Sequence, residues 1–287
     1  MEIIHTIEAI RQSVRQRCTE GKTIGLVPTM GALHAGHGSL IEAAAGECDF
    51  VVVSIFVNPT QFGLGEDLDK YPRTLETDAE FCEKLGADLI FAPSADEMYP
   101  SEQLTWVEVE KLTDGLCGAN RPGHFKGVTT VCSKLFNIVG ADVAFFGQKD
   151  AQQTAVIRRM VCDLNLPLEI RVCPIIREPD GLAMSSRNRY LSAEERKHAL
   201  CLHRALTVCR EQIAAGQRDT NSLIGTMEAV IEQDQAQIDY VGIVDAETLE
   251  PFEIVTDGAL VALAIHVGPT RLIDNILIDL NNLPNIV

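Results

Sequence analysis

The sequence lacks several features that would identify its class at once. No apolar run approaches the roughly 20 residues that a membrane-spanning helix needs. The nine cysteines include no CxxC pair, which argues against a zinc site and favours reduced thiols in a cytoplasmic protein. The first residues, MEIIHTIEAIRQSV, have neither the charged start nor the apolar block of a signal peptide. Their spacing instead predicts a helix with Ile3, Ile7, Ile10 and Val14 on one face.

Basic residues are also scarce. The 287-residue chain has 24 of them against 41 acidic residues, a net charge of −17, and Arg271 is the only basic residue after residue 218. An acidic surface repels a phosphate backbone, so we expect no nucleic-acid partner. Any anionic ligand must be held by a local pocket, against the overall field.

Strand-like and helical patterns alternate through the first ~180 residues. Strands are predicted over residues 23–27, 50–57, 88–91, 105–109, 143–146 and 168–176, and helices over 36–46, 74–85, 128–139 and 150–164. This alternation predicts an α/β fold: a Rossmann-like parallel sheet with helices on both faces.

The character of the chain changes after Ser192. The SAEE motif can cap a helix that runs to about residue 215, and a second helix is predicted over 222–233. Strands over 240–244, 259–267 and 271–278 follow, which predicts a smaller α+β C-terminal domain with an antiparallel sheet. We therefore divide the chain into domains 1–176 and 177–287.

Polar or glycine-rich segments follow four of the predicted parallel strands, and ligands of such sheets bind at the carboxyl ends of the strands. In the first segment, PTMGALHAGH, Gly31 and Gly36 let the backbone approach a ligand closely. The helix that begins near Gly36 suits phosphate, and His34 and His37 lie on one side of its first turn. The chain has no Walker A or GxGxxG motif, so this is a different phosphate cradle.

Each of these residues also has a purely structural explanation. The two histidines could be polar residues at a helix start or half of a metal site, although no third ligand stands at a useful spacing. Asp150 and Gln153 could form a capping box, Asn58 could begin a turn, and Lys149 could be a solvated lysine. Ser185 and Ser186 could be loop residues, and His124 could orient a loop; we leave His124 outside the site.

His34-Ala35-Gly36-His37 matches the HxGH signature of the nucleotidyl-transferring α/β superfamily, which includes class I aminoacyl-tRNA synthetases. The blocks VPTMGALHAGH, VSIFVNPTQF, YPRTLETD, RPGHFKGV, FFGQKDAQQ and PDGLAMSSRNRYL together resemble the pantothenate synthetase (pantoate–β-alanine ligase) family, in family order and over essentially the whole chain. Ala183-Met184-Ser185-Ser186-Arg187 stands where the synthetases carry KMSKS; neither lysine is present, as in this family.

The resemblance implies that ATP drives the condensation of (R)-pantoate with β-alanine to pantothenate, AMP and pyrophosphate through a pantoyl adenylate. It implies an ATP- and pantoate-binding domain over 1–176 and a lid over 177–287. The catalytic residues would be His34, His37, Lys149 and Arg187, and pantoate and β-alanine would be held by Asn58, Gln61 and Gln153. The ATP-binding residues would be Met30, Gly31, Ala32, Leu33, His34, Ala35, Gly36, His37, Gly147, Gln148, Lys149, Asp150, Ile176, Met184, Ser185, Ser186 and Arg187.

The family also implies Mg²⁺ with ATP, with Asp67 and Asp69 as acidic residues of undecided role, and a cytoplasmic homodimer formed through the apolar FVVVSIFV region and its neighbours. Two other functions stay open. One is a different nucleotidyltransferase of the same fold, which would transfer the nucleotide and stop. The other is a nucleotide-binding regulator without turnover.

Overall fold

The computed structural model describes residues 1–63 and 65–282, and its contacts divide the chain into two compact units. Unit 1 comprises Met1–Glu110, Arg121–Gly147 and Val156–Pro174. Unit 2 comprises Lys111–Asn120, Gln148–Ala155 and Ile175–Val287. Two short segments, 111–120 and 148–155, therefore belong by their contacts to the C-terminal unit. The boundary between residues 176 and 177 stays a prediction.

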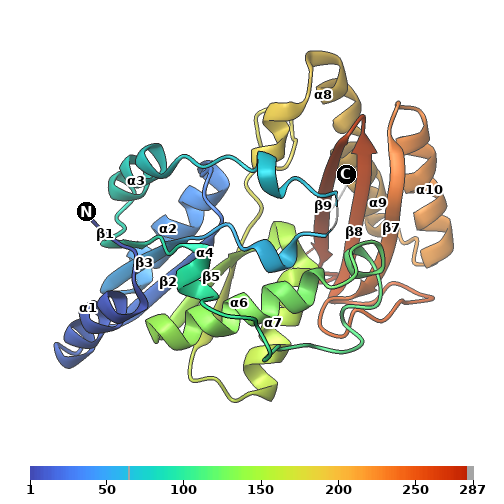
Figure 1. Ribbon diagram of the computed structural model, residues 1–287. Helices are drawn as coiled ribbons and strands as arrows, with labels where there is room; N and C mark the ends of the chain where they lie inside the picture. The colour runs from blue at the N-terminus through green and yellow to red at the C-terminus, as the bar shows by residue number, and fades with distance from the viewer. Residues whose placement is uncertain (64, 283–287) are drawn as a thin grey trace. The chain divides into compact units, whose positions relative to one another are not determined.

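Unit 1 is built on a six-stranded parallel sheet (Figure 1). The strands, in spatial order, are β1 (Glu2–Ile4), β4 (Leu89–Phe91), β3 (Phe50–Ile55), β2 (Ile24–Thr29), β5 (Val143–Gly147) and β6 (Glu169–Cys173). The central strands are nearly continuous apolar runs because both faces of a parallel sheet are covered. The sheet and its helices confirm the predicted α/β class.

Helices cover both faces of this sheet. On one face, α1 (Ile7–Thr19), α6 (His124–Val139) and α7 (Ala151–Asp163) contribute to a core with the inner side chains of the strands. On the other face, α2 (Ala35–Glu47) and α3 (Leu75–Lys84) contribute to a second core. Short helices complete the unit: η1 (Pro59–Gln61), η2 (Leu68–Lys70) and α4 (Ala95–Met98).

Two expectations about unit 1 were wrong. Residues 2–4 form a strand rather than the start of a helix, because they pair with β4. Residues 105–109 form no strand; the backbone of Val107 bonds instead to the hydroxyls of Thr129 and Thr130 on α6. Val52 and Val53 of the FVVVSIFV run are 0% exposed inside the sheet, and a dimer interface through this region and its neighbours stays a prediction.

Unit 2 contains a three-stranded antiparallel sheet, in the order β7 (Gln237–Asp245), β8 (Ala259–Val267) and β9 (Thr270–Ile278). One face packs against α9 (Cys201–Ala214) and α10 (Thr220–Glu232). The helix predicted over 192–215 is divided at Leu200 into α8 (Ala193–Ala199) and α9. The other face packs against Leu116, beside α5 (Cys117–Asn120), and Ala151.

Within residues 1–63 and 65–282, no helix combines the length and apolar character that crossing a membrane requires.

Candidate active site

The carboxyl ends of β3, β2, β5 and β6 lie side by side, because these strands are consecutive in the sheet and parallel. The chain leaves β2 toward β3 and leaves β5 toward β6, so the topology reverses between β2 and β5 (Figure 1). Ligands of open α/β sheets bind outside the strands at such a reversal. Met30 follows β2 directly and Gly147 ends β5, so both predicted segments begin at this point.

A buried carboxylate fixes the turn that follows β2. Gly31 and Ala32 have φ values of 83° and 52°, and the latter is unfavourable for a residue with a Cβ. Asp78 on α3 is 3% exposed and accepts hydrogen bonds from the backbone N–H groups of Ala32 and Leu33, each at 2.9 Å. It also accepts from the Thr74 hydroxyl at 3.1 Å. Asp78 therefore holds the turn in a backbone conformation that the residues of the turn, Ala32 in particular, do not favour.

The two predicted histidines begin α2 and are ordered by its backbone. His34 is the N-cap, and its Nδ1 accepts from the Gly36 N–H at 3.1 Å. The Nδ1 of His37 accepts from the His34 N–H at 3.4 Å, and the two ring centroids are 4.1 Å apart. Because Nδ1 accepts in both rings, each neutral ring carries its proton on Nε2. Both rings are thus oriented by the backbone at the N-terminus of a helix.

Asn58, after β3, organises the second segment. It is 1% exposed, and its Nδ2 donates to Gln61 Oε1 at 3.0 Å and to the Gly127 carbonyl at 3.2 Å. Its Oδ1 accepts from the hydroxyls of Thr60 and Tyr99, both at 2.9 Å. These bonds give Asn58 a positioning role toward Gln61, whereas direct contact of Asn58 with a substrate stays a prediction.

Gln61 connects the first two segments. Its Nε2 donates to Met30 Sδ at 3.2 Å, so the residues that follow β2 and β3 meet. Its backbone carbonyl accepts from His124 Nδ1 at 2.8 Å and from Arg121. Arg121 in turn forms a bidentate pair with Glu66, at 2.7 and 2.6 Å. Burial raises the pKa of Glu66, but the bonds and charge of Arg121 outweigh this effect and lower the pKa below its usual range.

In the predicted GQKD segment, Gly147 ends β5 in unit 1, and the other three residues form the short helix η3 (Gln148–Asp150) of unit 2. Asn275 on β9 donates to the carbonyls of Gln148 and Lys149, at 3.0 and 2.9 Å. The Lys149 side chain has no hydrogen bond or ion pair with any residue that the structure describes. A lysine without such a partner in so acidic a chain fits the predicted contact with phosphate.

The last predicted segment begins as a short hairpin in unit 2. The Met184 N–H donates to the Ile176 carbonyl at 2.9 Å, and the Glu178 N–H donates to the Leu182 carbonyl at 2.8 Å. Gly181 closes the turn with φ 97°, a value that disfavours residues with a Cβ. The hairpin thus brings Ile176 and Met184, both predicted to bind ATP, next to each other.

Charged and polar side chains secure this hairpin. Arg177 forms a bidentate pair with the buried Asp274, at 2.6 and 3.0 Å, and donates to the Gly181 carbonyl at 3.1 Å. The buried Asn188 donates to the Ala183 carbonyl at 3.0 Å. Beyond the hairpin, the Ser185 hydroxyl caps the short helix η4 (Ser186–Tyr190), which carries Arg187.

The residues that sequence reasoning missed all hold a predicted segment in place. They are Asp78 for the turn after β2, Arg121 for Gln61, Asn275 for η3 and Asp274 for the hairpin. His124, which we left outside the site as a residue that could orient a loop, bonds to the Gln61 carbonyl. Gln153 lies half-buried on α7, and its contact with pantoate stays a prediction.

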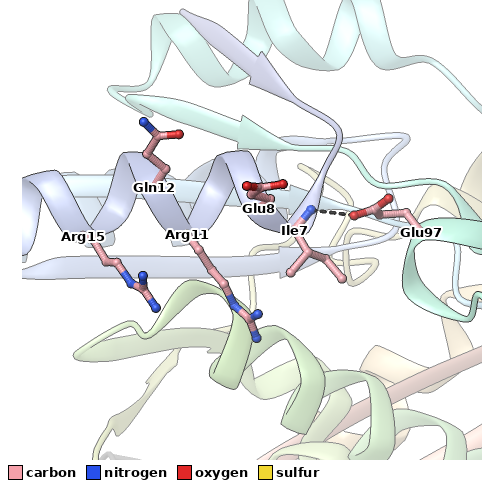
Figure 2. Close-up of a pocket in the computed structure, with 6 residues that line it drawn as sticks. All are labelled: Ile7, Glu8, Arg11, Gln12, Arg15 and Glu97. Atoms are coloured by element: carbon pink, nitrogen blue, oxygen red, sulfur yellow. Dashed lines mark hydrogen bonds between the residues drawn. The ribbon is translucent and has the colours of Figure 1, made fainter.

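One surface hollow of unit 1 lies elsewhere. It has a volume of about 600 Å³, and none of the predicted site residues line it. Figure 2 shows the lining residues and the 2.7 Å hydrogen bond from the Ile7 N–H to Glu97; they are Ile7, Glu8, Arg11, Gln12, Arg15 and Glu97. Two arginines there are balanced by two glutamates, so the hollow shows no preference for an anion.

Comparison with known proteins decides the family. Residues 2–277 match the sequence model of the pantoate–β-alanine ligase family. The chain belongs to the pantoate–β-alanine ligase family. Among curated members, it is 55% identical to the pantothenate synthetase of Heliobacterium modesticaldum over 97% of this chain and 100% of that protein. It is 54% identical to that of Moorella thermoacetica over 98% and 100%.

Solved structures of this ligase family agree. The pantothenate synthetase of Thermus thermophilus matches with a TM-score of 0.92 and 45% identity, over 96% of this chain and 99% of that chain. The pantoate–β-alanine ligase of Francisella tularensis, solved with β,γ-ATP and β-alanine, matches with a TM-score of 0.79 and 35% identity, over 96% and 97%. The predicted ligase is confirmed, and the alternative of another nucleotidyltransferase is not favoured.

Proposed function

We propose that the chain makes pantothenate in two steps at the strand ends described above. In the first step a carboxylate oxygen of (R)-pantoate attacks the α-phosphorus of ATP, and the bond to the β-phosphate breaks to release pyrophosphate. In the second step the neutral amine of β-alanine attacks the acyl carbon of pantoyl adenylate. The carbon–oxygen bond then breaks, AMP leaves, and the nitrogen loses a proton to give the amide.

The arrangement of His34 and His37 is the observation that carries this proposal. Their Nδ1 atoms accept from backbone N–H groups, which orients both rings at the start of α2. In the proposed reaction their Nε2 atoms would donate to the phosphates of ATP. Donors that are already oriented stabilise the charge that moves onto pyrophosphate, and they need no reorganisation during the reaction. The partial positive charge of the helix N-terminus adds to this effect. Lys149 and Arg187 supply the full positive charges.

Amide side chains suit the other substrate. Gln61 is held from two sides, by Asn58 at its Oε1 and by Met30 at its Nε2, so its orientation is fixed before pantoate binds. Gln61 and Gln153, with Asn58 behind Gln61, would grip the hydroxyls and carboxylate of pantoate. Neutral amides bind a small polar acid without adding charge next to the attacking carboxylate.

The second step needs no protein nucleophile, since the mixed anhydride is already activated. The thiols support this view. Burial raises the pKa values of Cys82, Cys132, Cys201 and Cys209 to about 12, so these cysteines hold almost no thiolate at neutral pH.

We infer that Mg²⁺ enters with ATP. Within the described residues, no three His, Cys, Asp or Glu side chains gather closely enough to hold a metal ion. Mg²⁺ that accompanies a nucleotide keeps several waters and binds the phosphates, with one or two carboxylates at most. The residues present fit such a metal–nucleotide complex, in which the ion would neutralise phosphate charge.

We also propose a homodimer in the cytoplasm. Reduced thiols fit a cytoplasmic location, since none of the nine cysteines, all of which are described, is in a disulfide. The dimer rests on family resemblance, and its expected contact surface is the FVVVSIFV region with its neighbours. Light scattering at several protein concentrations tests it, and a mass of 31.4 kDa throughout would contradict it.

Exchange of labelled pyrophosphate into ATP tests the reaction. We expect exchange with pantoate alone, and AMP in step with pantothenate once β-alanine is added. His37→Ala and Lys149→Ala should each slow adenylate formation by about 10²–10³-fold in single turnovers. Lys84→Ala, at an exposed lysine of α3, is the matched control and should be normal. Release of AMP without any amide product would refute the ligase assignment.

A further inference from the structure

Two adjacent polar residues are buried in β9, an edge strand of the antiparallel sheet. Asp274 is 2% exposed and Asn275 is 3% exposed, in a strand that also buries Thr270, Leu272 and Ile278. Successive side chains of a strand point to opposite faces of the sheet. Asp274 therefore shares the face of Leu272 and Ile278, which packs against α9, and Asn275 shares the face that packs against Ala151.

The side-chain amide of Asn275 directs its hydrogen bonds to one segment that is predicted to bind ATP. Both Nδ2 hydrogens donate to backbone carbonyls, of Gln148 and of Lys149, while its Oδ1 accepts from Gln148 Nε2 at 3.3 Å. Two carbonyls held by one side chain fix the orientation of the peptide groups in η3. The direction in which Lys149 leaves the backbone is fixed with them.

Asp274 acts on another segment, on the opposite face. Its two oxygens bind the guanidinium of Arg177, which also donates to the Gly181 carbonyl at the tip of the hairpin. Asp274 Oδ1 further accepts from the Asn275 N–H at 2.8 Å. The hairpin that ends in Met184 is thus tied to the same two residues of β9 that hold η3.

We propose that Asp274 and Asn275 are positioning residues for ATP, which fix the GQKD segment and the hairpin before Met184–Arg187 against a single strand. The inference rests on the proposed function and extends it, because it gives the C-terminal sheet a task in nucleotide binding. An apolar β-branched residue would suit this buried strand position better than asparagine. Asn275 instead provides an amide whose Nδ2 donates to both carbonyls.

Asn275→Leu tests the idea, since leucine has nearly the same size and shape but no hydrogen-bonding groups and no charge. We expect the KM for ATP to rise about tenfold or more, because the two carbonyls lose their donors. The KM for pantoate should stay within about twofold. Asn275→Ser keeps one donor, so its KM for ATP should lie between those of the unaltered protein and Asn275→Leu. Thr270→Val, at another buried polar residue of β9, is the control and should leave both constants unchanged.

Four outcomes separate the possibilities. A selective rise in the KM for ATP, with a graded effect of serine, supports the positioning role. An unchanged KM for ATP in Asn275→Leu overturns it, as does a parallel rise for ATP and pantoate that follows the loss in Tm. If the unaltered protein forms no AMP from ATP, pantoate and β-alanine, the proposed function fails instead. Calorimetric titration with ATP alone repeats the comparison without turnover.

Discussion

Asp78→Asn should both destabilise unit 1 and slow the first chemical step. The carboxylate of Asp78 accepts from two backbone N–H groups and a hydroxyl, whereas an amide offers a single acceptor oxygen. If that oxygen stays with Ala32, the new NH₂ group faces the Leu33 N–H, so one bond is lost and two donors oppose each other. Hydrogen bonds to a charged group contribute about 1.5–3 kcal/mol, and a stranded buried donor costs about 1–3 kcal/mol. We expect a loss of about 2–4 kcal/mol.

The effect on catalysis follows from the same bonds. The Gly31–Leu33 turn leads directly into His34, so its relaxation moves both imidazoles relative to the phosphates. A misplacement of about 1 Å can cost about 100-fold in rate. Urea denaturation gives the stability, and single-turnover formation of adenylate gives the rate. Glu80→Gln is the matched control: it removes one negative charge from the same helix at an exposed position, so its stability should stay within ~0.5 kcal/mol. If Asp78→Asn behaves like this control in both assays, the turn does not depend on the carboxylate and our reasoning fails.

Two further predictions concern the hairpin of unit 2. Gly181→Ala should lower the free energy of unfolding by about 1–3 kcal/mol more than Gly216→Ala, measured by urea denaturation. Both glycines have φ near 100°, but a Cβ at Gly181 would lie 2.4 Å from His203 Cδ2, whereas a Cβ at Gly216 would have open space. Equal losses of stability in the two variants would show that the clash is absent. Burial, and next the charge of Arg177, lower the pKa of His203 although Asp274 opposes them, so the folded protein resists protonation there. The contribution of His203 to stability should be complete above the pKa of about 6.5 that histidine has in the unfolded chain, and should fall as the pH drops below that value. His203→Phe, which fills the same space, should remove this dependence on pH. An unchanged profile of stability against pH in this variant would contradict the assignment.

The sequence predicted the sheet well because a buried strand shows its burial in its own apolar pattern. The run from Phe50 is apolar at nearly every position, as a central parallel strand requires, and the bounds predicted for residues 259–267 are those of β8. Prediction failed where a partner far along the chain decides the structure. Residues 2–4 become a strand only because β4 lies beside them, about 87 residues away. Residues 105–109 have strand-like composition, but the backbone N–H and carbonyl of Val107 bond to hydroxyls of α6.

The candidate site divides in the same way. The residues predicted to touch substrates lie in continuous segments that follow strands, and therefore their spacing and chemistry were visible in the sequence. The residues that hold those segments come from far away: Asp78 is 46 residues from Ala32, Arg177 is 97 from Asp274, and Gln148 is 127 from Asn275. No local pattern distinguishes Asp78 from an exposed helical aspartate.

Once their burial is known, the free-energy cost of burying polar groups distinguishes these positioning residues from ordinary core residues. Taking a carboxylate or an amide out of water costs free energy, and an apolar side chain of similar size is often at least as stabilising in its place. Stability alone therefore gives no reason to keep Asp78, Asp274 or Asn275 at 2–3% exposure. What they share is the target of their bonds, since each holds a segment that the sequence had marked for the nucleotide. A fixed loop geometry explains all three better than a contribution to the core, and it predicts that shape-preserving substitutions such as Asn275→Leu disturb ATP binding more than they disturb folding.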